Sequence, residues 1–225
     1  MGIVAVPWAI VVPVKRLALA KSRLQVADEV RTALALAMTL DTVAAALACD
    51  RVGLVVTVTD DQRAAAQLAS SGAVVVADEP DAGLNPALAH GARVAAARVA
   101  AAGVAALSAD LPALRPAELG AVLDAAADHP AALVADADGD GTTLLTARPA
   151  STFRSAFGVG SRAAHTALGA TDLSGLAGPS LRRDVDTLEH LGAAAIIGCG
   201  PATAEILRAY GLVPDATRAA EAPEI

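Results

Sequence analysis

The chain has 225 residues, of which 55% are hydrophobic and only 2% aromatic, and it carries a formal net charge of −7. These values predict one large domain with a core of Ala, Val and Leu, and they argue against a nucleic-acid-binding protein. Cys49 and Cys199 are isolated, so neither a disulfide framework nor a zinc site is predicted. The apolar stretch 3–14 is short for a bilayer span of roughly 20 residues and lacks signal-peptide flanks. We therefore expect a cytoplasmic protein that binds no membrane.

Strand-like and helix-like segments alternate along the chain. The strand candidates lie at 9–14, 54–58, 73–77, 104–108, 132–135 and 143–146. Helical patterns lie between and after them, at about 26–49, 61–70, 84–102, 116–128, 161–168 and 201–210. The first two strands are continuous apolar runs, which is typical of strands buried on both faces. The alternation predicts an α/β fold with a mostly parallel central sheet flanked by helices, as one domain over 1–213 with a flexible tail at 214–225.

A basic cluster follows the first predicted strand, where open α/β sheets bind ligands. Its members are Lys15, Arg16, Lys21 and Arg23. No glycine-rich phosphate loop is present, so a polyphosphate would have to be held by side chains, with Lys as a point charge and Arg as a planar fork. Lys21 and Arg23 are two residues apart and can face one ligand only if this segment is not helical. The alternative is a solvated helix start without a ligand.

Three aspartates form a candidate site for a divalent cation. Asp110 ends the fourth predicted strand, while Asp184 and Asp186 are two apart, so an extended backbone directs both carboxylates to one face. Carboxylates this close repel each other and favour a hard cation such as Mg²⁺. As alternatives, Asp110 is a turn residue and Asp186 caps a helix that starts near Thr187.

Two adjacent threonines follow an acidic, glycine-containing segment at 136–141. The segment resembles a calcium-binding loop, but the Glu required at its twelfth position is replaced by Ala147, which excludes an EF-hand. Thr142 and Thr143 offer hydroxyl donors for an anion, although turn or strand-start residues are the commoner interpretation.

Ser161 follows a second glycine-containing segment, 157–160. We predict that it caps a short helix whose free backbone amides bind phosphate or carboxylate, with ordinary capping as the alternative. The histidines have no ligand spacing and are interpreted as structural or surface residues: His90, His129, His165 and His190.

Six segments in this order resemble the guanylyltransferases of coenzyme F-420 biosynthesis, which comprise bacterial phosphoenolpyruvate and archaeal 2-phospho-L-lactate enzymes. The segments are IVVPVKRLALAKSRL at 10–24, GLNPAL at 83–88, LSADLPAL at 107–114, ADGDGTTLL at 137–145, FGVGSRAAH at 157–165 and RRDVDT at 182–187. The resemblance implies a single-domain, GT-A-like and Rossmann-like nucleotidyltransferase fold that lacks a glycine-rich first loop.

The resemblance also implies a role for each matching residue. Those that hold the triphosphate of GTP would be Lys15, Lys21 and Arg23, and Asn85 would lie in a loop that borders the nucleoside. Those that bind Mg²⁺, as two ions, would be Asp110, Asp184 and Asp186. The phosphorylated acid would be held by Gly158, Ser161 and either Thr142 or Thr143. Lys21, Arg23 and Asp110 would act in catalysis, and Arg162 departs from the aromatic residue of the archaeal members.

The implied reaction transfers GMP from GTP to phosphoenolpyruvate and gives enolpyruvyl-diphospho-guanosine and pyrophosphate. 2-Phospho-L-lactate and 3-phosphoglycerate are alternative acceptors, and a downstream transferase that consumes the product is the expected protein partner. Two other functions compete with this one. A GT-A glycosyltransferase normally has Asp two positions before Asp110, where this chain has Ser108. A non-catalytic nucleotide-binding module would bind GTP without releasing pyrophosphate.

Overall fold

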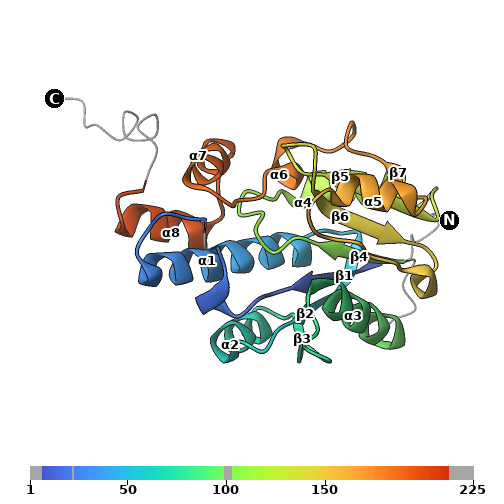
Figure 1. Cartoon of the computed structure of the whole chain (residues 1–225), viewed down its shortest axis with the longest axis horizontal. Coiled ribbons are helices and arrows are strands. Elements are labelled where there is room, and N and C mark those ends of the chain that lie inside the picture. Colours follow the sequence, from blue (N-terminus) through green and yellow to red (C-terminus); the bar gives the residue numbers. More distant parts are fainter. Residues whose placement is uncertain (1–6, 22, 99–102, 213–225) are drawn as a thin grey trace.

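The computed structural model describes residues 7–21, 23–98 and 103–212. Its centre is a seven-stranded sheet, in the described part of the chain, with the order β3-β2-β1-β4-β6-β5-β7 (Figure 1). The strands are β1 Trp8–Pro13, β2 Val52–Val58, β3 Val74–Val76, β4 Val104–Leu107, β5 Ala131–Ala135, β6 Thr142–Ala147 and β7 Thr171–Asp172. All neighbouring pairs are parallel except the two that involve β6. The predicted single-domain α/β fold with a mostly parallel sheet is therefore confirmed. The tail predicted at 214–225 lies outside the described residues.

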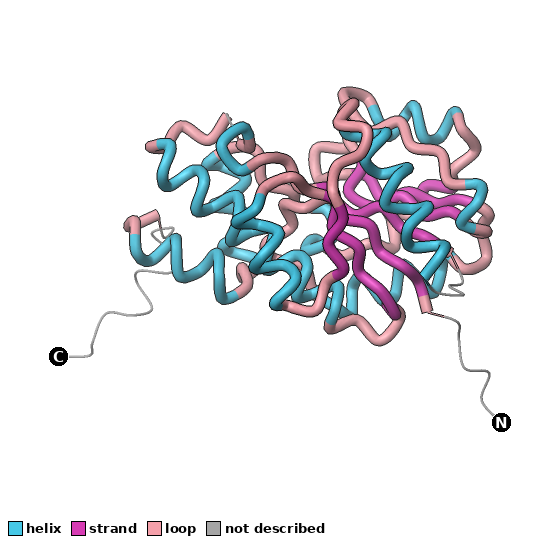
Figure 2. Tube along the Cα trace, turned by 90° about the horizontal axis from the view of Figure 1, so that it is seen from below, coloured by secondary structure: helices cyan, strands magenta, loops and turns pink. Residues whose placement is uncertain are grey.

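Helices cover both faces of the sheet, and Figure 2 shows them on either side of the strands. They are α1 Asp28–Leu47, α2 Gln62–Ser70, α3 Leu84–Arg98, α4 Pro116–Ala126, α5 Ser161–Ala167, α6 Pro179–Arg182, α7 Leu188–Ile197 and α8 Pro201–Ala209. Two 3₁₀ turns, η1 Leu17–Leu19 and η2 Ala150–Thr152, complete the elements. The helix predicted at 84–102 ends at Arg98 in the described residues. For α7 the sequence predicted only a helix start near Thr187, without an end. No sequence pattern predicted α6 or β7, which are too short to show a period.

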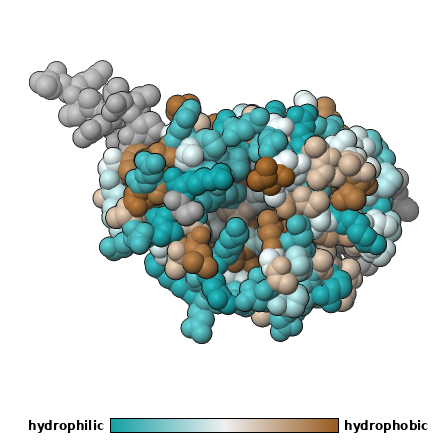
Figure 3. All heavy atoms as spheres, viewed as in Figure 1, coloured by the Kyte–Doolittle hydropathy of each residue, from teal (hydrophilic) through white to brown (hydrophobic). Residues whose placement is uncertain are grey.

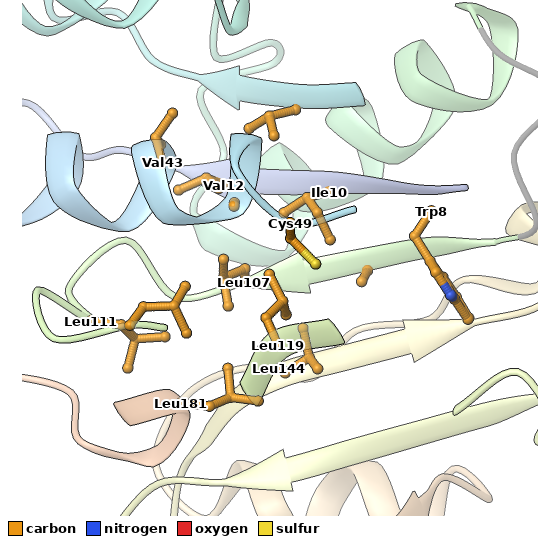
Figure 4. Packing of buried hydrophobic residues seen from close by; sticks show 14 of the residues in the cluster. Trp8, Ile10, Val12, Val43, Cys49, Leu107, Leu111, Leu119, Leu144 and Leu181 are labelled. Carbon is orange, nitrogen blue, oxygen red and sulfur yellow. The ribbon is translucent and has the colours of Figure 1, made fainter. Parts of the chain in front are cut away.

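Alternate residues of β1 pack into two different cores because successive strand side chains point to opposite faces. Ile10 and Val12 belong to the larger core, which buries them against side chains of α1 and α4 (Figure 4). Ala9 and Val11 belong to the second core, on the face that α3 covers. Gly91 of α3 lies directly on this face, and a Cβ at that position would overlap the side chains of Val11 and Val58. Small residues therefore allow close contact between helix and sheet.

The reversed direction of β6 follows from the short connection before it. A parallel pair needs a crossover of a dozen or more residues, whereas a hairpin needs only a few. Between β5 and β6 the chain has only the loop 136–141, and Leu133 pairs with Leu145 in antiparallel register. The Asp136 carboxylate folds this loop by accepting the backbone N–H groups of Gly139, Asp140 and Gly141 at 2.6 to 3.0 Å. The hairpin thereby brings Thr142 to the same edge of the sheet as the carboxyl ends of the parallel strands.

Helix α1 has the length and apolar composition of a membrane span, but its apolar side chains belong to the core. Of its most apolar 18-residue window, 56% is buried inside the fold. In Figure 1, α1 lies beside α8, although the two helices come from opposite ends of the chain. The buried Asp41 of α1 fixes this contact, because its carboxylate accepts the N–H groups of Ala202 and Thr203 at 3.0 and 2.7 Å. The composition of α1 is therefore that of a core helix.

Candidate active site

A cleft of about 660 Å³ opens at the carboxyl ends of β1 and β4. Figure 3 shows the face viewed in Figure 1 hollowed near its centre, with hydrophilic and hydrophobic side chains beside the hollow. The cleft is lined by the segment after β1, the loop after β4, the β5–β6 hairpin loop and the segments 157–161 and 184–190. This is the edge at which the sequence predicted a ligand site.

Lys21 is the buried cation of the cleft. It lies in the turn between η1 and α1, and its backbone has the left-handed conformation (φ +56°) that is uncommon outside glycine. Its Nζ pairs with Asp110 and lies 2.9 Å from Asp186 Oδ1, while only 12% of its side chain is exposed. Burial lowers the pKa of Lys21, but the carboxylates of Asp110 and Asp186 outweigh burial and hold that pKa above its ordinary value. Lys21 is therefore an ammonium ion inside a carboxylate pair.

Arg23 reaches the same carboxylate from the solvent side. Its Nη1 is 3.9 Å from Asp186 Oδ2, and 76% of its side chain is exposed. Lys21 and Arg23 both lie in turns and both approach Asp186, so the condition for facing one ligand is met at these two residues, whereas the ligand itself stays a prediction. Lys15 also lines the cleft and is exposed. Arg16 turns away from this group and pairs with Asp60 and Asp81 at 3.5 and 3.4 Å.

The three predicted aspartates lie together, although they come from two distant segments. The backbone N–H of Val185 donates to the carbonyl of Asp110 at 3.1 Å and joins these segments. Burial, followed by the neighbouring carboxylates of Asp110 and Asp186, raises the pKa of Asp184 to about 7. Burial also raises the pKa of Asp186, but the Lys21 ammonium outweighs burial and lowers it overall. We call Lys21, Arg23 and these three aspartates the charged cluster.

The charged cluster is not arranged as a finished metal site. Among the described residues, no three Asp, Glu, His or Cys side chains converge with the geometry of a metal site. The ammonium of Lys21 instead neutralises Asp110 and Asp186. The alternative role of Asp186 as a helix cap is wrong, because α7 is capped by Thr187, whose Oγ1 accepts the N–H of His190 at 3.2 Å.

A group of hydroxyls lies across β6 and α5. Thr142 begins β6 and lines the cleft, whereas Thr143 faces away from the cleft and its hydroxyl donates to the carbonyl of Val134 at 3.5 Å. Of these two threonines, Thr142 is therefore the one that can contact a ligand in the cleft. Ser161 also lines the cleft, and its Oγ donates to Thr142 Oγ1 at 3.2 Å. Gly158 adds a backbone wall in a conformation (φ +144°) that other residues rarely adopt.

The prediction that Ser161 caps its helix is wrong. Gly160 occupies the cap position of α5 with φ +68°, and Ser161 is the first helical residue. Gly is accepted at helix caps and tolerates this backbone conformation, so the serine hydroxyl is left for Thr142. The first two backbone N–H groups of α5 are used inside the fold, because those of Ser161 and Arg162 donate to the carbonyls of Gly158 and Asp140 at 3.2 and 3.0 Å.

Asn85 lies in the first turn of α3, as the helical pattern at about 84–102 predicted, and not in the loop that the resemblance implied. Its Oδ1 accepts the N–H of Phe157 at 2.8 Å, and its Nδ2 donates to the carbonyl of the same residue at 3.0 Å. Both polar atoms of the side chain are thus used to hold the segment that carries Gly158. Asn85 does not itself line the cleft.

Sequence reasoning missed the residues that fix the hairpin loop to the segment 182–190. Arg182 donates to the carbonyls of Ala135 and Asp136 at 3.2 and 2.9 Å. Arg183 and His190 both approach Asp138, at 3.5 and 3.6 Å. Arg182 and Arg183 directly precede Asp184 in the RRDVDT segment, and this position next to a candidate site residue could have indicated their role.

His165, which the sequence indicated as a structural or surface residue, is a structural residue beside Thr142. Its side chain is fully buried and stands four residues after Ser161, on the same side of α5. Its Nδ1 is 3.0 Å from Thr142 Oγ1. We call Thr142, Ser161 and His165 the hydroxyl cluster.

The cleft brings cations, carboxylates and hydroxyl groups together at the carboxyl edge of a mostly parallel sheet. This arrangement fits a nucleotidyltransferase. The chain belongs to the family described as guanylyl transferase CofC like, whose model matches residues 8–222.

Curated relatives agree with this class, and a solved structure agrees with the fold. The chain is 58% identical over 200 residues to a phosphoenolpyruvate guanylyltransferase of Thermomonospora curvata, covering 88% of both chains. It is 56% identical over 201 residues to one of Streptomyces coelicolor, covering 88% of this chain and 95% of the relative. Its fold is similar to a crystal structure from Desulfovibrio desulfuricans G20 described as a nucleotide-diphospho-sugar transferase, with a TM-score of 0.62, 16% identity, and coverage of 91% of this chain and 96% of that one.

Proposed function

We propose that the protein transfers GMP from GTP to phosphoenolpyruvate, giving enolpyruvyl-diphospho-guanosine and pyrophosphate in coenzyme F-420 biosynthesis. The observation that carries the proposal is the presence in one cleft of a charged cluster and a hydroxyl cluster. The first suits a triphosphate and the second suits a phosphorylated acid. The names of the relatives at 56% and 58% identity support the same reaction.

The reaction needs no side-chain nucleophile, because the phosphate of the acid is already ionised. One of its oxygens attacks the α-phosphorus of GTP, a new P–O–P linkage forms, and the bond to pyrophosphate breaks. Both reactants are anionic, so their repulsion must be reduced before they can approach. Lys15, Lys21 and Arg23 supply positive charge for the triphosphate and for the negative charge that grows on pyrophosphate.

A divalent cation fits the donor set of the charged cluster. Burial and then the carboxylates of Asp110 and Asp186 raise the pKa of Asp184, so a cation bound beside these groups would stabilise its ionised form. Carboxylate oxygens are the ligands that Mg²⁺ prefers. Asp110, Asp184 and Asp186 would hold Mg²⁺, as one or two ions. When bound, Mg²⁺ would screen the charges of the two reactants. The cation would then neutralise Asp110 and Asp186 in place of Lys21, and the Lys21 ammonium could pair with the phosphates.

Thr142, Ser161 and Gly158 would hold the acid. Phosphoenolpyruvate has its carboxylate and phosphate on one planar frame, so it loses little rotational freedom on binding. 2-Phospho-L-lactate and 3-phosphoglycerate carry the same two groups and are the competing acceptors. The product, an activated diester, would be consumed by a downstream transferase. We place the reaction in the cytoplasm, which agrees with the free thiols of Cys49 and Cys199.

The test is pyrophosphate release with GTP, Mg²⁺ and each acid in turn. We expect release with all three ingredients present and the highest kcat/KM with phosphoenolpyruvate. A higher kcat/KM with another acid would change the proposed acceptor but would still support guanylyl transfer. GTP binding without pyrophosphate release under every condition would contradict the proposal and favour a nucleotide-binding module.

A further inference from the structure

Both ring nitrogens of His165 make hydrogen bonds inside the fold. Nε2 accepts the backbone N–H of Ala156 at 2.9 Å, and Nδ1 lies 3.0 Å from Thr142 Oγ1. The ring of Phe157 packs edge-on against the imidazole, with a centroid distance of 4.8 Å and an interplanar angle of 71°. Phe157 is itself held at its backbone by Asn85. The ring of His165 is therefore fixed in both position and orientation.

These contacts determine which nitrogen carries the proton. A backbone N–H can only donate, so Nε2 must be an unprotonated acceptor towards Ala156. A neutral imidazole has one N–H, which is then on Nδ1 and donates to Thr142 Oγ1. Burial lowers the pKa of His165 to about 4, so the ring is neutral near pH 7. A protonated ring would place an Nε2–H group against the N–H of Ala156.

The tautomer of His165 in turn determines the direction of the Thr142 hydroxyl. Thr142 Oγ1 receives one hydrogen bond from His165 and another from Ser161. Its own hydrogen therefore cannot be used towards His165, and among the described residues no acceptor takes it. Since Thr142 lines the cleft, this hydrogen is available to a ligand there.

We propose that His165 is a positioning residue that turns the hydroxyl hydrogen of Thr142 into the cleft, so that Thr142 presents a donor to an anionic acceptor substrate. This role rests on the proposed function, which places the phosphorylated acid beside Thr142 and Ser161. With the opposite tautomer, Thr142 would donate to His165 and would show only oxygen lone pairs to the cleft. Those lone pairs would repel a phosphate or carboxylate.

The tautomer can be measured without any substrate. The full chain is labelled with ¹⁵N-histidine, and the ring nitrogens are followed by NMR between about pH 5 and 8. His165→Asn, which removes one signal set, assigns the resonances. We expect a neutral Nδ1–H tautomer that does not titrate in this range. An Nε2–H tautomer, or protonation of His165 within the range, would overturn the proposal.

Two substitutions separate the two hydrogen bonds of His165. The amide of Asn takes the position of Nδ1 and keeps a donor towards Thr142, whereas the amide of Gln reaches the position of Nε2 and keeps an acceptor for Ala156. We expect His165→Asn to change the KM for the acid less than threefold and His165→Gln to raise it about tenfold, the effect of losing roughly one hydrogen bond. The KM for GTP should stay unchanged in both variants. Equal effects of the two variants on the acid, or equal changes in the two KM values, would indicate a purely structural role.

A double-mutant cycle tests whether His165 acts through Thr142. In a Thr142→Val background, we expect His165→Gln to add nothing further to the KM for the acid. In a Thr143→Val background, which serves as the matched control, it should show its full effect. Full additivity in both backgrounds would overturn the proposal. If a variant does not fold, the NMR measurement on the unsubstituted chain still decides the tautomer. If the unsubstituted protein releases no pyrophosphate with any acid, the proposed function fails, and the tautomer is judged separately by NMR.

Discussion

The charged cluster and the hydroxyl cluster line the same cleft but are held in place by different physical means. In the charged cluster, ionised groups neutralise one another, and Arg23 and Asp186 are partly open to solvent. In the hydroxyl cluster, Thr142, Ser161 and His165 are neutral, buried and joined by hydrogen bonds. An arriving polyanion changes the balance of charge in the first cluster, so that cluster must rearrange. The second cluster is already formed, so it can select by shape and by the direction of its donors.

The largest expected effect comes from removing the buried cation. Lys21→Met keeps most of the side-chain volume and removes the charge, and we expect kcat/KM to fall roughly 10²- to 10³-fold, as for loss of a major electrostatic donor. Arg51→Met is the matched control, because Arg51 pairs with Asp124 at 2.6 Å outside the cleft. Steady-state pyrophosphate release should be near normal for the control. A Lys21 variant with nearly full activity would show that the charged cluster has no catalytic role.

The second prediction concerns the neutral state of His165 and its dependence on pH. The pKa of His165 is lowered by burial from its ordinary 6.5 to about 4. Below about pH 6.5, His165 binds a proton in the unfolded chain but not in the folded chain. The free energy of unfolding therefore falls as the pH is lowered from about 6.5 to about 4. The loss in the free energy of unfolding is at most about 3 kcal/mol.

Urea unfolding of the unsubstituted chain and of His165→Asn at several pH values measures this effect. Carboxylate titrations are common to both proteins and cancel in the difference. We expect the stability advantage of the unsubstituted chain over the variant to shrink as the pH falls from about 6.5 to 4. A difference that does not change with pH would mean that His165 accepts a proton in the folded state.

A smaller and more selective effect is expected from Ser161→Ala. This variant removes the hydrogen bond that Ser161 donates to Thr142 Oγ1 and that helps to direct the Thr142 hydrogen into the cleft, which corresponds to roughly 1 kcal/mol, or about fivefold in KM. The change should appear in the KM for the acid and not in the KM for GTP, because Ser161 belongs to the hydroxyl cluster. If the KM for GTP rises by the same factor, the division of the cleft between the two substrates is incorrect.

The smallest effect is expected from Thr143→Val, one residue further along β6. Valine has nearly the same shape as threonine, and the only hydrogen bond lost is the long one to Val134 at 3.5 Å. We expect the free energy of unfolding to change by about 1 kcal/mol or less, with an unchanged KM for the acid. Thr142→Val, by contrast, should raise the KM for the acid. Reversed effects of the two variants would place the hydroxyl cluster on the other face of β6.

Much of the site could be predicted from the positions of polar residues after apolar strands. Lys21, Arg23 and Asp110 follow β1 and β4, and parallel strands bring their carboxyl ends to one edge. The reversed direction of β6 was also accessible, because the connection at 136–141 is too short for a crossover. The pairing of Lys21 with Asp186 was not accessible, since no local pattern reports contacts between residues so distant in the chain.

Local sequence preferences did not predict the partners of two side chains, those of Ser161 and Asn85. Gly160 and Ser161 are both acceptable helix caps, and only the left-handed backbone of the folded loop decides for the glycine. The resemblance implied that Asn85 borders the nucleoside, whereas both polar atoms of its side chain bind the backbone of Phe157. In both cases tertiary contacts determine the partner of the side chain.

The close contact at Gly91 has a consequence for attempts to broaden the range of acceptors. Helix α3 carries Asn85 at its start and touches the sheet at Gly91, where a methyl group would overlap Val11 and Val58. Any larger residue must move the helix outward, and the Asn85 clamp on Phe157 moves with it. Substituting Gly91 alone would therefore reshape the cleft through its support, because Gly91 does not itself line the cleft.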